Sequence, residues 1–168
     1  LDEADGWIQL INTVDQARGV PVIVNTAARS GSGVARYGAT LKSTLGELGR
    51  KLVTLWIINR QRDSLELLVD YLDAMPVGAD HQAHVLRNLY FGAAEKFQLY
   101  NGSDIKKRIE ENGGKTLDFP DLADRVADQL ATDRLTIQGA LEAMPLGHKA
   151  ELARWRNEAT KTLAQVMP

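Results

Sequence analysis

The basic side chains between residues 26 and 62 are the clearest candidates for chemistry in this chain. The stretch contains seven Lys or Arg residues and one acid, Glu47, whereas the whole chain has a formal net charge of −2 at pH 7. Arg29, Arg60 and Arg62 come just after apolar runs that are typical of strands. Clustered guanidinium groups bind phosphates or nucleic-acid backbones, but they also occur on ordinary solvated surfaces. The sequence leaves both interpretations open.

Three asparagines, Asn25, Asn59 and Asn88, each follow or end an apolar run. If the runs are parallel strands, their carboxyl ends meet at one edge of the sheet, where α/β proteins bind ligands. Asparagine can both donate and accept hydrogen bonds there. A shared polar crevice is therefore expected, although asparagine also ends strands without any further role.

Two glycine-containing segments resemble phosphate-binding loops in part. In residues 113–116, GGKT, the motif G-x-x-x-x-G-K-[ST] requires glycine where the chain has Ile109, and a helix is expected before it. Residues 31–33, GSG, lie between an expected strand and a helix, but Arg36 stands where a dinucleotide fold has its third glycine. The first segment is better explained as a helix-ending turn. The second could hold an anion through backbone N–H groups.

Catalytic and metal sites find little support in the sequence. His81 and His84 are three residues apart, but they lie near an expected turn and lack further ligands. The chain has no cysteine and no serine in a G-x-S-x-G context, and no carboxylate pair is placed for acid–base chemistry. We name no catalytic residue and no metal ligand.

The elements that would position these residues alternate between strand and helix. Apolar runs predict strands at residues 20–25, 53–58, 83–91 and 116–119. Amphipathic helices are expected between them, capped by Asp63 or Ser64, by Ser103 or Asp104, and by Asp121. The fold class is therefore α/β, with a mainly parallel sheet flanked by helices and a C-terminal helical extension. We expect residues 1–132 to form the α/β domain and residues 133–168 to pack on it.

Composition is that of an ordinary globular protein, with 44% apolar and 25% charged residues. The absence of cysteine favours a reducing cytoplasm, and no apolar run approaches the roughly 20 residues that span a bilayer. The first residue is leucine rather than methionine, so a fragment or a processed chain is one expectation.

The order of these parts resembles the ParA/MinD-like P-loop ATPases, in particular the ATPase-like proteins of plasmid partition, stability and conjugative transfer. The resemblance covers about residues 20–131. It rests on four segments of moderate specificity, which are VIVNTAARSG, LVTLWIINRQRDSLELL, HVLRNLYFG and TLDFPDLADRVADQL. It implies a Rossmann-like P-loop fold and a nucleotide-dependent homodimer that acts on DNA or on a partition or transfer protein.

The resemblance also implies roles for single residues. Asn88 would contact the nucleotide base, and Pro120 and Asp121 would border it. Asn25 occupies the place of a carboxylate associated with Mg²⁺, and Ser64 would start the helix beside the active-site edge.

The chain departs from the family pattern in one major respect, because it contains no G-K-G-G-V-G-K-T loop. Asn25 is also neutral where the family has an acid. ATP and Mg²⁺ are expected if such a loop lies upstream, and these 168 residues alone are expected not to hydrolyse ATP. The alternative is a non-catalytic module whose basic edge, with Arg29, Arg60 and Arg62, binds nucleic acid or an acidic protein.

Overall fold

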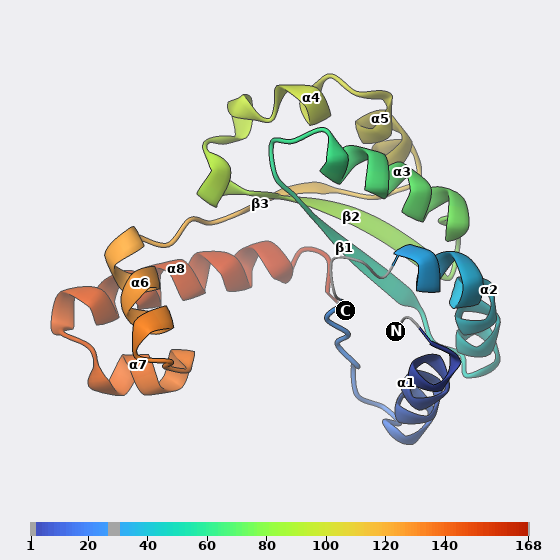
Figure 1. The fold of residues 1–168 in the computed structure, drawn as a ribbon, viewed down its shortest axis with the longest axis horizontal. Coiled ribbons are helices and arrows are strands. Elements are labelled where there is room, and N and C mark those ends of the chain that lie inside the picture. Colours follow the sequence, from blue (N-terminus) through green and yellow to red (C-terminus); the bar gives the residue numbers. More distant parts are fainter. Residues whose placement is uncertain (1–2, 27–30, 168) are drawn as a thin grey trace.

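A three-stranded parallel sheet forms the centre of the computed structural model, which describes residues 3–26 and 31–167 (Figure 1). The strands lie side by side in chain order, as β1 (Leu52–Ile58), β2 (His81–Asn88) and β3 (Thr116–Phe119). Ile58 pairs with Arg87, and Asn88 pairs with Phe119. All three carboxyl ends therefore lie at one edge, and the predicted α/β class with a parallel sheet is confirmed.

Helices connect and flank the strands. Their bounds are α1 (Ala4–Gln16), α2 (Gly31–Glu47), α3 (Asp63–Ala74), α4 (Gln98–Asn101), α5 (Asp104–Glu111), α6 (Asp124–Thr132), α7 (Ile137–Ala143) and α8 (Leu146–Leu163), with short 3-10 turns η1 (Leu89–Phe91) and η2 (Ala94–Lys96). None of these helices combines the length and apolar character needed to cross a membrane.

The two faces of the sheet are covered by different parts of the chain. On one face, a cluster that includes Ile58, Leu68, Val85 and Ile109 joins the strands to α3 and α5. On the other, Leu86 and Leu117 pack against Leu163 at the end of α8 and against Val166, which follows that helix. The first half of α8 instead packs with α6 and α7 around Val126, Ala140, Met144 and Leu152. Helix α8 thus links the helical C-terminal part to the sheet (Figure 1).

Helices α1 and α2 form a further cluster, centred on Trp7, Val14, Leu41 and Leu45. Gly38 explains how α2 also approaches α3, because a Cβ at this position would lie 2.4 Å from the sulfur of Met75. Glycine in this helix therefore permits close packing, which offsets its low helix propensity of about 1 kcal/mol relative to alanine.

The strand predicted at residues 20–25 is absent, which corrects the sequence-based expectation. Residues 21–26 are irregular, and Val20, Ile23 and Val24 are 56%, 77% and 44% exposed. The run has the composition of a strand, but a strand needs a hydrogen-bonded neighbour, and no other described segment pairs with it. Only Val22 packs on the α1–α2 cluster.

Smaller corrections concern where elements begin and end. Strand β2 ends at Asn88, so residues 89–91 form the turn η1 rather than more strand. Residues 31–33 belong to the first turn of α2 and not to a loop, and Gly33 is buried there. The GG turn before β3 is a helix end as expected, since α5 stops at Glu111 and Gly113 has φ of 78°.

The cap predictions had mixed outcomes. Ser103 caps α5, as predicted, by accepting the Lys106 N–H at 3.2 Å. Asp121 does not cap α6, because that helix starts three residues later, after Ala123. Helix α3 also lacks a side-chain cap.

Candidate functional site

The carboxyl edge of the sheet brings together most of the residues singled out in the sequence. Residues 59–62 follow β1, residues 89–92 follow β2, and Pro120 and Asp121 follow β3. Asn88 lies directly beside Phe119, and therefore next to Pro120. We refer to residues 59–62, 88–96 and 120–121 as the carboxyl edge. It contains Asn88, Pro120, Asp121, Arg60 and Arg62.

Two predicted site residues are not part of this edge in the structure. Asn25 lies in the irregular segment 21–26 and is exposed, so it does not end a strand beside Asn59 and Asn88. Arg29 falls outside the described residues.

Asn59 and Asn88 form the same local structure at the ends of β1 and β2. The Asn59 side-chain oxygen accepts the Gln61 N–H at 2.8 Å, and the Asn88 oxygen accepts the Tyr90 N–H at 3.1 Å. Each asparagine side chain thus stabilises a turn in which the backbone leaves the strand. The oxygen of each amide is occupied in this way, while the NH₂ group of Asn88 makes no hydrogen bond to the described residues and can donate to a ligand.

Arg87 holds the edge together from within β2. Its Nε donates to the Asp118 carboxylate at 2.7 Å, and its Nη1 donates to the Asn101 side-chain oxygen at 2.8 Å. Asn101 in turn donates to the carbonyl of Ala94 at 2.9 Å. The Arg87 side chain is only 16% exposed. One guanidinium group therefore joins β2, β3, α4 and the segment that follows η1.

Helix α8 fixes the end of β3. Trp155 Nε1 donates to the Pro120 carbonyl at 2.9 Å, and the Trp155 ring lies edge-on to Phe119 with centroids 5.9 Å apart. Arg154 donates to the Asp121 carbonyl at 3.3 Å. The backbone at Pro120 and Asp121 is therefore held by α8, whereas the Asp121 side chain is exposed.

Arg60 and Arg62, the two basic residues after β1, differ in whether they form an ion pair. Arg62 forms an ion pair with Glu66 at 2.9 Å on the exposed surface of α3. Arg60 donates to the Phe91 carbonyl at 3.4 Å and forms no ion pair with any described residue.

Sequence reasoning missed the two aromatic residues beside Arg60. Tyr90 and Phe91 are 66% and 41% exposed, and their adjacency directly after Asn88 was the available signal.

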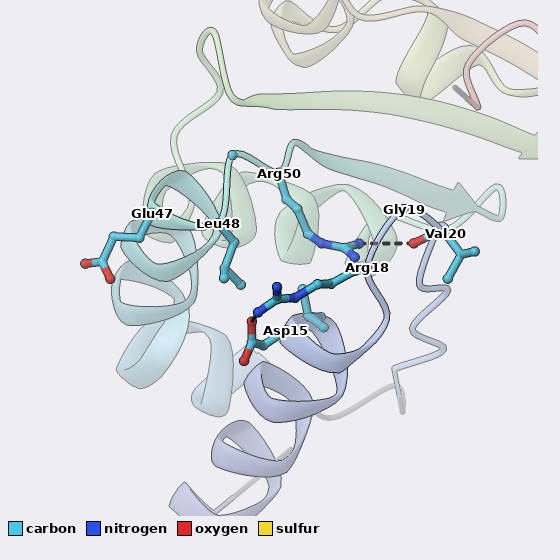
Figure 2. A pocket seen from close by; sticks show the side chains of 9 residues that line it. Asp15, Arg18, Gly19, Val20, Glu47, Leu48 and Arg50 are labelled. Atoms are coloured by element: carbon cyan, nitrogen blue, oxygen red, sulfur yellow. Dashed lines mark hydrogen bonds and ion pairs between the residues drawn. The ribbon is translucent and has the colours of Figure 1, made fainter.

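A depression lies elsewhere, between the ends of α1 and α2 (Figure 2). It has a volume of about 610 Å³, and charged side chains line it, among them Asp15, Arg18, Glu47 and Arg50. Figure 2 shows Arg50 reaching the turn after α1, where it donates to the carbonyls of Val20, at 3.1 Å, and Ala17. Arg18 pairs with Asp15 at 3.8 Å. Arg18 and Arg50 thus stabilise the C-terminal end of α1. Their presence in the depression is therefore explained by their role in the fold.

His81 and His84, which the sequence gave little support as metal ligands, both make hydrogen bonds within the fold. His81 bonds to Thr54 at 3.0 Å and to the Pro76 carbonyl at 3.3 Å, while His84 Nδ1 accepts the Lys115 N–H at 3.0 Å. Both rings are almost fully buried, and this burial lowers the pKa of each. The described residues contain no group of three or more metal-ligating side chains.

Comparison with known proteins places the chain. It is 57% identical over 167 residues to Protein MobD of Acidithiobacillus ferrooxidans, and the match covers 99% of this chain and 72% of that protein. The chain belongs to the MobD family. No protein-family model matches it, and no solved structure matches it either. Because the MobD match spans nearly the whole chain, it includes the carboxyl edge and the helices that support it.

The carboxyl edge of this MobD-family chain carries groups that can bind a ligand. It offers an amide donor, backbone groups, two arginines and two exposed aromatic rings. Among the residues that the structure describes, it contains no paired nucleophile and base. Ligand recognition is therefore what its chemistry supports.

Proposed function

We propose that this MobD-family protein acts in plasmid mobilisation as a ParA/MinD-like nucleotide-binding protein. The family relationship supports the mobilisation role, because the relative carries the name MobD. One observation supports the nucleotide site. Three parallel strands in chain order bring Asn88, Pro120 and Asp121 to the same carboxyl edge, which is where the resemblance expects the nucleotide base.

In this proposal the Asn88 NH₂ group donates to the base, and Pro120 and Asp121 border it. The ligand is ATP with Mg²⁺. The turns at Asn88 and Pro120 are held by their own hydrogen bonds, so this side of the site is preorganised. The 168 residues contain no loop of the form G-x-x-x-x-G-K-[ST] for the phosphates, so hydrolysis by them alone is not expected.

Nucleotide binding would act as a switch by favouring a homodimer, which then engages DNA or a transfer protein. Arg60 and Arg62 at the carboxyl edge, with Arg29, are the proposed partner-binding cations. A ligand shifts such an equilibrium only through its different affinity for the two states. Molar mass measured by light scattering, with and without ATP and Mg²⁺, tests this step.

Calorimetric titration with ATP and Mg²⁺ tests the nucleotide site itself. Asn88→Asp keeps the oxygen that accepts the Tyr90 N–H but removes the NH₂ donor, so affinity should fall about tenfold, a loss of about 1.4 kcal/mol. Asn59→Asp is the matched control, because it makes the same change in the same kind of turn at the end of β1. The proposal fails if ATP does not bind, or if the two variants weaken binding equally.

A mating assay tests the biological role separately. The transfer frequency of a plasmid that carries this gene is compared with that of the same plasmid after deletion of the gene. We expect transfer to fall on deletion and to return when the gene is supplied in trans. Unchanged transfer would contradict a role in mobilisation, whatever the nucleotide titration shows.

A further inference from the structure

Two cations converge on Gly92 at the carboxyl edge. A Cβ built on Gly92 would lie 3.8 Å from the Lys96 Nζ and 3.9 Å from the Arg60 Nη1, so both positive groups gather over the same backbone position. Gly92 has φ of 120°, a conformation that disfavours any residue with a side chain. Neither cation forms an ion pair with a residue in the described part of the chain. Two cations that converge on one backbone position favour the binding of an anion there.

Two exposed aromatic residues directly precede Gly92 in the chain. Tyr90 and Phe91, the two residues before Gly92, pack edge to face with centroids 5.2 Å apart. They remain 66% and 41% exposed, and the Phe91 carbonyl accepts a hydrogen bond from Arg60. The rings therefore present apolar surface to solvent, and they belong to the two residues that precede the backbone position where the cations converge.

The backbone under this surface is held in place. Asn88 fixes the start of η1, and Asn101, which Arg87 holds, donates to the carbonyl of Ala94 between Gly92 and Lys96. A rigid aromatic and cationic surface loses little conformational entropy when it binds a ligand.

We propose that Tyr90, Phe91, Arg60 and Lys96 form a binding surface for single-stranded nucleic acid. Unstacked bases stack on exposed aromatic rings, and cations beside the rings neutralise the phosphates that connect those bases. A duplex hides the faces of its bases, so it could use the cations but not the rings. An acidic peptide has no regular series of flat rings that could stack on both aromatic residues. This surface does not depend on ATP binding at Asn88.

Fluorescence anisotropy with a labelled 20-nucleotide oligo(dT) measures this binding directly. Tyr90→Ala combined with Phe91→Ala should weaken binding at least tenfold, because each base–aromatic stack makes a large contribution. Tyr90→Trp should retain binding. Leu99→Ala and Leu146→Ala are the matched controls, since they remove exposed apolar side chains at positions 55% and 83% exposed outside this surface. Far-UV circular dichroism confirms that each variant is folded.

Salt dependence tests the cations separately. Each phosphate neutralised on a single strand contributes about 0.7 to the slope of log affinity against log salt. Arg60→Ala with Lys96→Ala should therefore reduce the slope by about 1.4. Arg156→Ala with Lys161→Ala, which removes two exposed cations of α8, should leave the slope unchanged.

Four outcomes would overturn the proposal. A 20-base-pair duplex could bind equally or more tightly, or the double aromatic variant could keep its affinity for oligo(dT). The slope could stay unchanged in the Arg60 and Lys96 variant. Finally, ATP could displace oligo(dT) completely, which would mean that the surface takes a free nucleotide. Oligo(dT) binding is measured without nucleotide, and ATP binding is measured without DNA, so each proposal has its own titration. A failure here is therefore distinguishable from a failure of the nucleotide proposal.

Discussion

Replacing Arg87 with alanine should loosen the whole carboxyl edge, because this side chain links β2 directly to β3 and α4. It donates to Asp118 at 2.7 Å and to Asn101 at 2.8 Å, and it is 16% exposed. In the variant, Asn101 and Asp118 each lose a partner. The Asp118 side chain is 41% exposed, so water can replace part of what it loses.

The expected size follows from these two bonds. A hydrogen bond to a charged group contributes about 1.5–3 kcal/mol, and solvent screening at Asp118 places its bond at the low end of that range. We expect Arg87→Ala to lower the free energy of unfolding by about 3 kcal/mol. For a chain of this length, that corresponds to a fall in Tm of about 6–12 °C.

Urea unfolding followed by tryptophan fluorescence measures this loss, and a double-mutant cycle with Asp118→Ala isolates the coupling between the two side chains. Arg62→Ala is the control, because the Arg62–Glu66 pair is exposed at both ends, and its loss should cost less than about 0.5 kcal/mol. Equal losses in the Arg87 and Arg62 variants, or a cycle with no coupling, would refute the reasoning.

The remaining predictions concern a glycine, two histidines and the missing loop. Gly114→Ala should unfold the protein or lower its free energy of unfolding by more than about 3 kcal/mol, because the new Cβ would lie 2.2 Å from the Ala83 carbonyl oxygen. Gly102→Ala is the control and should be tolerated. Thermal unfolding of the two variants compares them. Burial lowers the pKa of His81 and His84, so the unfolded chain takes up their protons first as pH falls through about 6.5. The free energy of unfolding should be level above that pH and fall below it, by at most about 1.4 kcal/mol per pH unit for each histidine; a flat profile between pH 7.5 and 5.5 would contradict this. The 168 residues should show no ATP turnover in a phosphate-release assay, and turnover lost on mutation within them would prove this wrong.

The strands that the sequence predicted correctly are those with neighbours in the structure. Residues 53–58 and 116–119 match β1 and β3 closely, and β2 overlaps the predicted run from residue 83 to residue 88. Their apolar runs bury side chains on both faces of the sheet. Residues 20–25 have the same kind of composition but no strand beside them among the described residues. Local sequence signals the tendency to form a strand, whereas pairing depends on distant segments.

The location of the candidate site could be predicted from a general rule, but several of the side chains that form it could not. Parallel strands place their carboxyl ends together, so Arg60, Asn88 and Pro120 were expected at one edge, as observed. Arg87 was missed because its partners are 14 and 31 residues away in sequence. The meeting of Lys96 with Arg60 was missed because it depends on the turn at Gly92.

The asparagines show that a polar residue at the end of a strand can have both a structural role and a role in binding. A polar crevice and a simple strand terminator were alternatives in the sequence, yet Asn59 and Asn88 use their side-chain oxygens to turn the chain, which is the terminator's role. That role orients the NH₂ group, since the amide is planar and one end is fixed. At Asn88 the turn also begins the segment that presents Tyr90 and Phe91 to solvent. The structural role of Asn88 therefore positions groups for binding, and Asn88→Asp separates the two because it keeps the turn and removes the donor.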